Sequence, residues 1–269
     1  MKRNYRDFGF GIIFYIPMLI TLFIIKFEII NDIRVIGSVF FISLLSIIYY
    51  FFGDPIIRRN NLEKFAKHES YDFFKAPLSN QLSEFKSFKS INRLKSFGDF
   101  NFINLLLPQQ KTSRDQSPKI VTCRREYRAD ELIRNYWYTQ VYLFETKKDL
   151  PSFLLISHAL QKNILQTESK LSDKSMNEMQ MQNYEFIDIK NNDLVKNKYN
   201  LYSTDKNIES LLDREFFNFI NDGIKKDMTV NIESNGRNFI FYVTDKRHSI
   251  HEMNFYINLF SIMTKKLLQ

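Results

Sequence analysis

Two histidines that are three residues apart, His248 and His251, are the only close pair of histidines in the sequence, and Glu252 lies beside them. On a helix, this spacing can place two ligands on one face. The residues just before the pair, Lys246 and Arg247, would repel a cation, and the pair falls in the first turn of a predicted helix whose start is exposed. We therefore expect two solvated histidines, with no metal and no cofactor.

A thiol nucleophile is the next chemistry to consider, because Cys123 could be activated by His158. Nothing in the sequence brings these two residues together, and His158 at the end of an apolar run is expected to be a hydrogen-bonded edge histidine. Asp205 could act as a catalytic carboxylate, but its position at a predicted helix start favours a capping role. Because Cys123 is the single cysteine, an intrachain disulfide and a multi-cysteine metal site are excluded. We assign no catalytic residue.

Phosphate or nucleic-acid binding would use the cluster of Arg124, Arg125 and Arg128, with Tyr127 available to stack on a base. A polar strand edge explains the same residues equally well, so nucleic acid is not an expected partner. The glycines that follow the apolar N-terminal region are isolated: Gly53, Gly98, Gly223 and Gly236. This isolation excludes a glycine-rich phosphate-binding loop and a dinucleotide-binding fingerprint.

The stretch from Leu82 to Phe97 combines basic residues with an apolar residue at every third position. One interpretation is a basic amphipathic helix on anionic lipid, where each Lys or Arg contributes roughly 1 kcal/mol. The other is an ordinary helix packed on the domain, because a three-residue repeat drifts around an α-helix. The residues predicted to contact anionic lipid are Arg58, Arg59, Lys86, Lys89, Arg93 and Lys95.

The element that must position all of these residues is a pair of uncharged apolar runs, Phe8–Ile25 and Val35–Phe52. Each is about 18 residues long, enough to cross a bilayer as a helix. A signal peptide is disfavoured because Lys26, Phe27 and Glu28 follow the first run in place of a small-residue cleavage site. Two buried helices of a soluble protein would usually keep a polar face. The sequence predicts a transmembrane helical hairpin over residues 1–53.

The orientation of this hairpin follows from the basic residues that flank it, since Lys and Arg near a span are retained in the cytoplasm. Lys2, Arg3 and Arg6 precede it, and Arg58 and Arg59 follow it. We therefore predict a multi-pass protein of the bacterial inner membrane with both termini in the cytoplasm. The net charge of +8 agrees with an anionic membrane surface as a partner.

The remaining chain is predicted to form a juxtamembrane helical linker over residues 54–118 and a cytoplasmic α+β domain over residues 119–269. The predicted strands are Ile120–Tyr127, Tyr136–Phe144, Phe153–Ile156 and Tyr199–Tyr202. A helix is expected from Ile208 to a stop at Gly223, followed by a hairpin that turns at Asn235-Gly236. Ser249 and Glu252 have the spacing of a capping box that opens a last helix.

Part of this domain, from Asp149 to Val243, resembles a bacterial family of membrane-anchored proteins of unknown function. The residues that carry the resemblance are Leu150-Pro151-Ser152-Phe153-Leu154-Leu155, Tyr199-Asn200-Leu201-Tyr202-Ser203-Thr204-Asp205, Leu211-Leu212 and Phe216-Phe217. The resemblance implies paired membrane helices and a cytoplasmic α+β domain, and it implies no activity.

Two functions are compatible with these features. The first is a non-enzymatic, membrane-anchored interaction or adaptor module whose cytoplasmic domain binds a protein partner or the membrane lipids. The second is an enzyme that acts on a lipid or envelope precursor at the inner leaflet. The first is preferred because the sequence has an anchor and lacks a catalytic constellation, whereas an enzyme predicts carboxylates or histidines that converge in a cleft.

Overall fold

The computed structural model describes residues 37–38, 41, 54–95, 99–109, 117–128, 134–145, 149–158, 160, 184–190, 192–212, 214–225, 230–244 and 248–268. The predicted membrane hairpin lies outside these ranges, apart from Gly37, Ser38 and Phe41. Within the described residues, no helix combines the length and the apolar character needed to span a bilayer. The chain divides into two compact units, Met1–Glu63 and Lys64–Gln269. The second unit contains the sheet described below.

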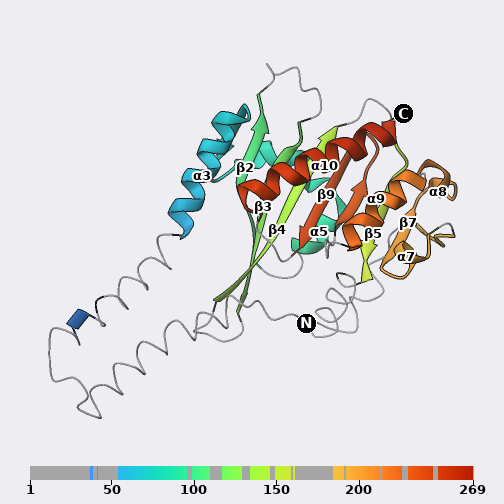
Figure 1. The fold of residues 1–269 in the computed structure, drawn as a ribbon, viewed down its shortest axis with the longest axis horizontal. Helices are drawn as coiled ribbons and strands as arrows, with labels where there is room; N and C mark the ends of the chain where they lie inside the picture. Colours follow the sequence, from blue (N-terminus) through green and yellow to red (C-terminus); the bar gives the residue numbers. More distant parts are fainter. Residues whose placement is uncertain are drawn as a thin grey trace, which may run out of the picture. The chain divides into compact units, whose positions relative to one another are not determined.

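The second unit is built on a nine-stranded sheet with the strand order β1-β2-β3-β4-β9-β8-β5-β7-β6 (Figure 1). Neighbouring strands run antiparallel throughout. The strands are β1 (Tyr71–Phe74), β2 (Asp99–Pro108), β3 (Lys119–Arg128), β4 (Arg134–Glu145), β5 (Phe153–Ser157), β6 (Glu185–Ile187), β7 (Tyr199–Ser203), β8 (Asn231–Ser234) and β9 (Asn238–Thr244).

The helices of the described chain are α3 (Asp54–His68), the 3-10 helix η2 (Ser79–Leu82), α4 (Ser83–Lys86), α5 (Lys89–Lys95), α7 (Asp193–Lys196), α8 (Ile208–Leu211), α9 (Arg214–Lys225) and α10 (Ile250–Leu268). Figure 1 shows α10 and α9 lying across the same face of the sheet. The sheet and its helices form the α+β fold that the sequence predicts.

The two faces of the sheet carry separate sets of apolar side chains, because successive residues of a strand point to opposite faces. On the α10 face, the Phe260 ring stacks on Phe241 at a centroid distance of 4.2 Å and meets Tyr142 edge-on at 5.3 Å. On the other face, Ile240 and Val141 join a buried cluster with Phe85 of α4. Both faces are therefore covered, which explains the continuous apolar runs Val141–Phe144 in β4 and Phe239–Val243 in β9.

The β8–β9 hairpin occupies the middle of the sheet, where β9 pairs with β4 and β8 pairs with β5. Its turn contains Gly236 with a φ of 111°, a conformation that residues with a side chain rarely adopt. The backbone N–H of Asn235 donates to the carbonyl of Asn238 at 3.0 Å and closes the turn. The predicted hairpin is confirmed.

Most predicted elements of the domain are confirmed, and two differ in extent. The helix predicted from Ile208 is interrupted near Leu212, where α8 ends before α9 begins, and α9 continues past Gly223 to Lys225. The sheet also begins earlier in the chain than a boundary at residue 119 predicts. Strands β1 and β2 lie in the stretch that was predicted to be a helical linker. This stretch forms strands because β2 pairs with β3 and covers the edge of β3.

Candidate functional site

The basic stretch from Leu82 to Phe97 is the first predicted site, and its three-residue apolar repeat is packed inside the domain. Leu82, Phe85, Phe88 and Ile91 are all buried in one cluster. A single α-helix could not bury all four, but the chain forms η2, α4 and α5 in succession with a break at Ser87. In a 3-10 turn, residues three apart eclipse one another, and the break redirects the next turn toward the sheet. The packing alternative is confirmed for these four residues.

The basic side chains of this stretch have contacts within the domain. Lys86 Nζ donates to the Ser79 carbonyl oxygen at 3.4 Å and also to the Ser79 hydroxyl. Lys89 Nζ lies 4.1 Å from the centre of the Tyr184 ring, a cation–π arrangement. Arg93 and Lys95 belong to α5, and their side chains lie outside the described part of the chain. Contact of these residues with lipid stays a prediction.

A buried carboxylate holds this stretch against the sheet. Glu233 on β8 is 1% exposed, and it accepts hydrogen bonds from the backbone N–H of Lys89 at 2.7 Å and of Ser90 at 2.9 Å. It also accepts one from the Ser90 hydroxyl. We call Glu233, Lys89 and Ser90 the Glu233 clamp. A further bond from Asn235 Nδ2 to the Ser87 hydroxyl, 2.7 Å long, adds a second link between the hairpin and the helical break.

The pKa values of Glu233 and of the nearby Tyr184 are both raised. Burial raises the pKa of Glu233, because the charged form loses its hydration, and the bonds from Ser90 and Lys89 oppose this shift only in part. Burial also raises the pKa of Tyr184, and the nearby charge of Glu233 raises it further. The sequence analysis missed this site. The only signal for it was a carboxylate within a strand of the predicted hairpin, and its partners lie far away in the chain.

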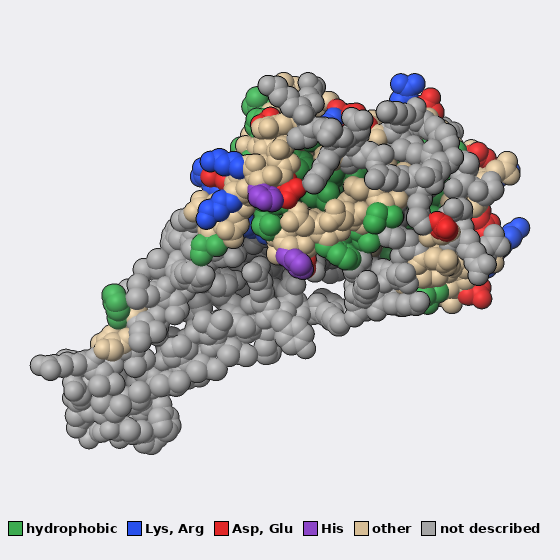
Figure 2. Space-filling model, turned by 45° about the horizontal axis from the view of Figure 1, so that its top comes forward, with side chains coloured by type: hydrophobic (Ala, Val, Ile, Leu, Met, Phe, Trp, Pro, Cys, Tyr) green, Lys and Arg blue, Asp and Glu red, His purple; other side chains and the backbone are tan. Residues whose placement is uncertain are grey.

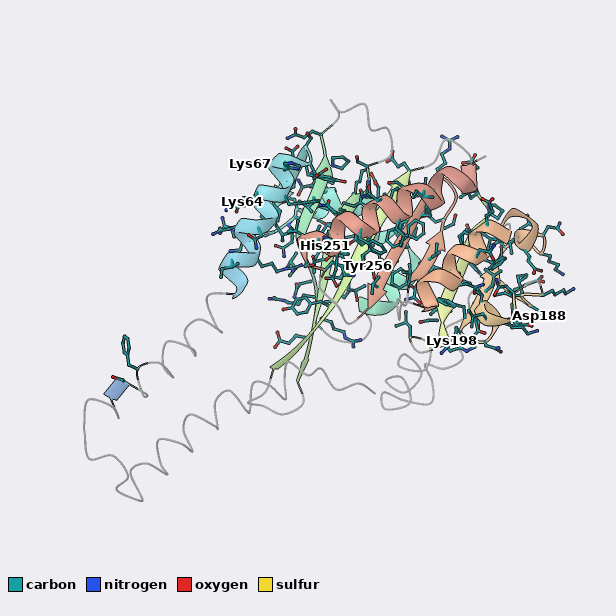
Figure 3. All side chains as sticks on the ribbon, in the orientation of Figure 1. Lys64, Lys67, Asp188, Lys198, His251 and Tyr256 are labelled. Carbon is teal, nitrogen blue, oxygen red and sulfur yellow. The ribbon has the colours of Figure 1, made fainter. Side chains whose placement is uncertain are left out.

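The histidine pair is divided by the fold, and the expectation that His248 is solvated is wrong. His248 is 0% exposed, its Nδ1 lies 2.6 Å from the Tyr142 hydroxyl, and its ring stacks on Tyr256 at 4.2 Å. His251 is exposed on α10 (Figure 3). The reason is that α10 begins only at Ile250, so His248 precedes the helix and turns inward. One buried and one exposed ring do not form a two-histidine metal site.

The helix start itself is as predicted. The Ser249 N–H donates to a Glu252 carboxylate oxygen at 2.8 Å, and the Glu252 N–H donates to the Ser249 hydroxyl at 3.3 Å. These reciprocal bonds form the capping box. Asp205 also has a local structural role, because its carboxylate accepts the N–H of Asn207 at 2.8 Å just before α8.

Cys123 and His158, the possible nucleophile and its base, are far apart in the sheet. Cys123 is buried in β3, whereas His158 is exposed after β5 and its Nε2 lies 3.1 Å from Asn200 Oδ1. Strands β4, β9 and β8 lie between β3 and β5. This arrangement does not place the imidazole within hydrogen-bond reach of the thiol, which a general base requires.

The arginine cluster of β3 is divided between the two faces of the sheet. Arg124 pairs in register with Tyr138, and Arg125 pairs with Trp137. Consecutive strand residues point to opposite sides, so these two guanidinium groups do not converge on one phosphate. The backbones of Tyr127 and Arg128 lie in β3, and their side chains are outside the described part.

Helix α3 carries the other basic residues predicted to meet lipid. Arg58 is half-buried, and the Nε of the exposed Arg59 donates to Glu63 Oε1 at 2.8 Å. An exposed pair at this spacing contributes only about 0.3–0.5 kcal/mol, so Arg59 has little to lose by exchanging it for a phosphate. Lys64 and Lys67 are exposed further along the same helix (Figure 3).

Helix α10 presents apolar side chains on both of its sides. Its inner side buries Met253, Tyr256 and Phe260 against the sheet. On its outer side, Phe255 is 38% exposed and Ile262 is 51% exposed. Apolar side chains are visible among polar ones on the face drawn in Figure 2. Phe255 and Ile262 are seven positions apart, about two helical turns, so both lie on the same side of α10.

Comparisons with known proteins identify a structural likeness and no family. No protein-family model matches the sequence, and no curated protein matches it. Among solved structures, the fold is similar to that of the mycobacterial trehalose monomycolate transport factor A, TtfA, with 12% sequence identity and a TM-score of 0.46. The similarity covers 78% of this chain and 93% of that chain. At this score, the likeness carries no functional argument.

Proposed function

We propose that this protein is a non-enzymatic interaction module, anchored in the bacterial inner membrane by residues 1–53, whose α+β domain lies in the cytoplasm. The observation that supports it best is the placement of the potentially reactive side chains. Cys123 and His158 are separated by three strands of the sheet order, and His248 and Asp205 make structural hydrogen bonds. These residues stabilise the fold, whereas the outer side of α10 presents apolar side chains to solvent.

The test uses the full chain isolated from detergent-solubilised membranes, with mass spectrometry of the proteins and lipids that accompany it. We expect a defined protein partner whose recovery falls at least tenfold in a Phe255→Asp/Ile262→Asp variant. Leu194→Asp is the matched control, because Leu194 is equally exposed at 38% on α7. The control should retain the partner, and all variants should keep the same circular dichroism spectrum.

An enzymatic role is the outcome that would overturn the proposal. Purified full-length protein would be incubated with an envelope lipid extract, and the lipids would be compared by mass spectrometry before and after. We expect no new species. A new product that forms with the wild-type protein and not with Cys123→Ser or His158→Ala would show that these residues act in catalysis, despite their separation.

The predicted lipid contacts require a separate experiment on the full chain in nanodiscs. We propose that Arg58, Arg59, Lys86, Lys89, Arg93 and Lys95 face anionic headgroups. Hydrogen exchange at residues 79–95 should be slower in anionic than in neutral nanodiscs. This difference should shrink in 0.5 M salt, because salt screens the surface charges. The Debye length falls to roughly 3 Å at 1 M salt. Equal exchange in both lipids would reject a surface contact by this stretch.

A further inference from the structure

Lys89 belongs both to the Glu233 clamp, through its backbone, and to the set of basic side chains proposed above to meet anionic lipid. Its backbone N–H donates to the Glu233 carboxylate at 2.7 Å. Its side chain is exposed, and the Nζ lies 4.1 Å from the centre of the Tyr184 ring. A change of charge on Glu233 therefore occurs next to a cation that reaches the surface of the domain.

Glu233 interacts electrostatically with Lys89 in a largely apolar environment. In the sheet, Glu233 is paired in register with Leu154 and Ile240, which carry no charge. Within the described part of the chain, the titratable groups that face it are Lys89 on α5 and Tyr184 just before β6. Burial raises the pKa of Glu233, and the charge of Lys89 opposes this shift. Ionised Glu233 and Lys89 therefore attract each other.

We propose that Glu233 regulates the lipid contact of Lys89: protonation of the carboxylate releases the ammonium to anionic headgroups, and ionisation draws it back to the domain. This inference rests on the lipid contact proposed above for Lys89, and it adds control of that contact by pH. The carboxylate and a lipid phosphate compete for the same cation. Because such coupling is reciprocal, lipid binding favours protonation of Glu233 by the same factor by which protonation strengthens lipid binding. The contact is therefore stronger at acid pH.

Hydrogen exchange of the full chain in nanodiscs measures this coupling. At each pH from 8 to 5, the exchange rate of residues 79–95 in phosphatidylcholine nanodiscs is divided by their rate in phosphatidylglycerol nanodiscs. This ratio cancels the intrinsic effect of pH on exchange, because both rates are measured at the same pH. In the wild-type protein, the ratio should rise about fivefold as the pH falls, which is the effect of one lysine at an anionic surface.

Glu233→Gln and Lys89→Gln separate this coupling from other effects of pH. Glu233→Gln keeps the shape of the side chain without its charge, so its ratio should stay at the high, acid value throughout. Lys89→Gln removes the exposed cation and leaves the buried carboxylate intact, so its ratio should stay low at every pH, and this variant tests the coupling even if Glu233→Gln does not fold. Glu185→Gln, at an exposed carboxylate of β6, is the control and should keep the wild-type profile.

The outcomes distinguish failure of this inference from failure of the proposals above. A ratio above one that does not change with pH, or that changes equally in wild type and Lys89→Gln, would overturn the coupling and leave the lipid contact in place. A ratio of one at every pH would reject the lipid contact together with its control by Glu233. The proposed protein interaction is tested separately, by partner recovery with the Phe255→Asp/Ile262→Asp variant.

Discussion

The carboxylate of Glu233 accepts a hydrogen bond from the backbone N–H of Ser90 at 2.9 Å, although the two residues are 143 positions apart in the sequence. This bond joins the central β8–β9 hairpin to the start of α5. It fixes a basic segment that is otherwise held by apolar packing and by the bond from Asn235 to Ser87. The Glu233 clamp therefore stabilises the fold through a carboxylate that is buried.

Glu233→Ala should lower the free energy of unfolding by roughly 2–5 kcal/mol, because hydrogen bonds to a buried charged group are lost and the Ser90 donors remain inside. Chemical denaturation monitored by circular dichroism measures the change. Glu185→Ala is the control, since Glu185 lies on β6 and makes an exposed ion pair with Lys206 at 3.1 Å. A loss of less than about 0.5 kcal/mol in Glu233→Ala, as for an ordinary surface residue, would contradict the structural role of the clamp.

The raised pKa of Glu233 predicts the direction of a pH dependence. Between the ordinary glutamate pKa of 4.5 and the higher pKa of Glu233 in the fold, the native state binds more protons than the unfolded state. The contribution of Glu233 to stability is therefore present below pH 4.5 and declines as the pH rises through the folded pKa. In Glu233→Gln, the free energy of unfolding measured from pH 4 to 8 should lack this decline. An unchanged pH profile in Glu233→Gln would contradict the prediction.

Tyr142→Phe should destabilise the protein by about 1–3 kcal/mol, because the buried His248 Nδ1 loses the hydroxyl 2.6 Å away. Ring packing against Phe260 is retained, so the loss reports the hydrogen bond. Thermal unfolding measures the effect, with His251→Ala on the exposed part of α10 as the control. If Tyr142→Phe is neutral and His251→Ala is not, the assignment of the buried histidine is wrong.

Gly236→Ala should destabilise the β8–β9 hairpin by about 1–3 kcal/mol through backbone strain, because the φ of 111° is unfavourable for alanine. Steric overlap does not contribute, since an added Cβ would meet nothing within 4 Å. Arg237→Ala is the neighbouring control, and its exposed 2.9 Å ion pair with Asp149 should contribute less than about 1 kcal/mol. Equal losses in the two variants, from denaturant titration, would refute the strain argument.

Local sequence patterns predicted the elements that depend on neighbouring residues. The capping box of Ser249 and Glu252, the turn at Gly236 and the aromatic strand β4 all follow from spacing within a few residues. The strand order does not, because nothing in the sequence of β9 states that its partner is β4. The segment containing β1 and β2 was expected to be helical and outside the domain, since the pairing that makes these strands necessary is non-local.

For the candidate sites too, local sequence patterns predicted some features, whereas other features depend on contacts between distant residues. The exposure of His251 followed from local pattern, but the burial of His248 depends on Tyr142, more than 100 residues earlier. Phe85 and Phe88 were recognised as a repeat of three, but their packing required a helix break that a uniform helical period could not represent. Glu233 had no local indication of its partners, because its donors lie at the start of α5, more than 140 residues earlier in the chain.

The central position of the β8–β9 hairpin has a consequence for synthesis. Strands β1 to β4 can pair as soon as they have left the ribosome, and β5, β6 and β7 can pair as a second group. The two groups have no shared edge until strands β8 and β9, residues 231–244, have been synthesised. During elongation, each group presents an open strand edge, at β4 and at β5, for which chaperones or neighbouring nascent chains can compete. A premature stop before residue 230 would therefore leave two half-sheets that cannot join.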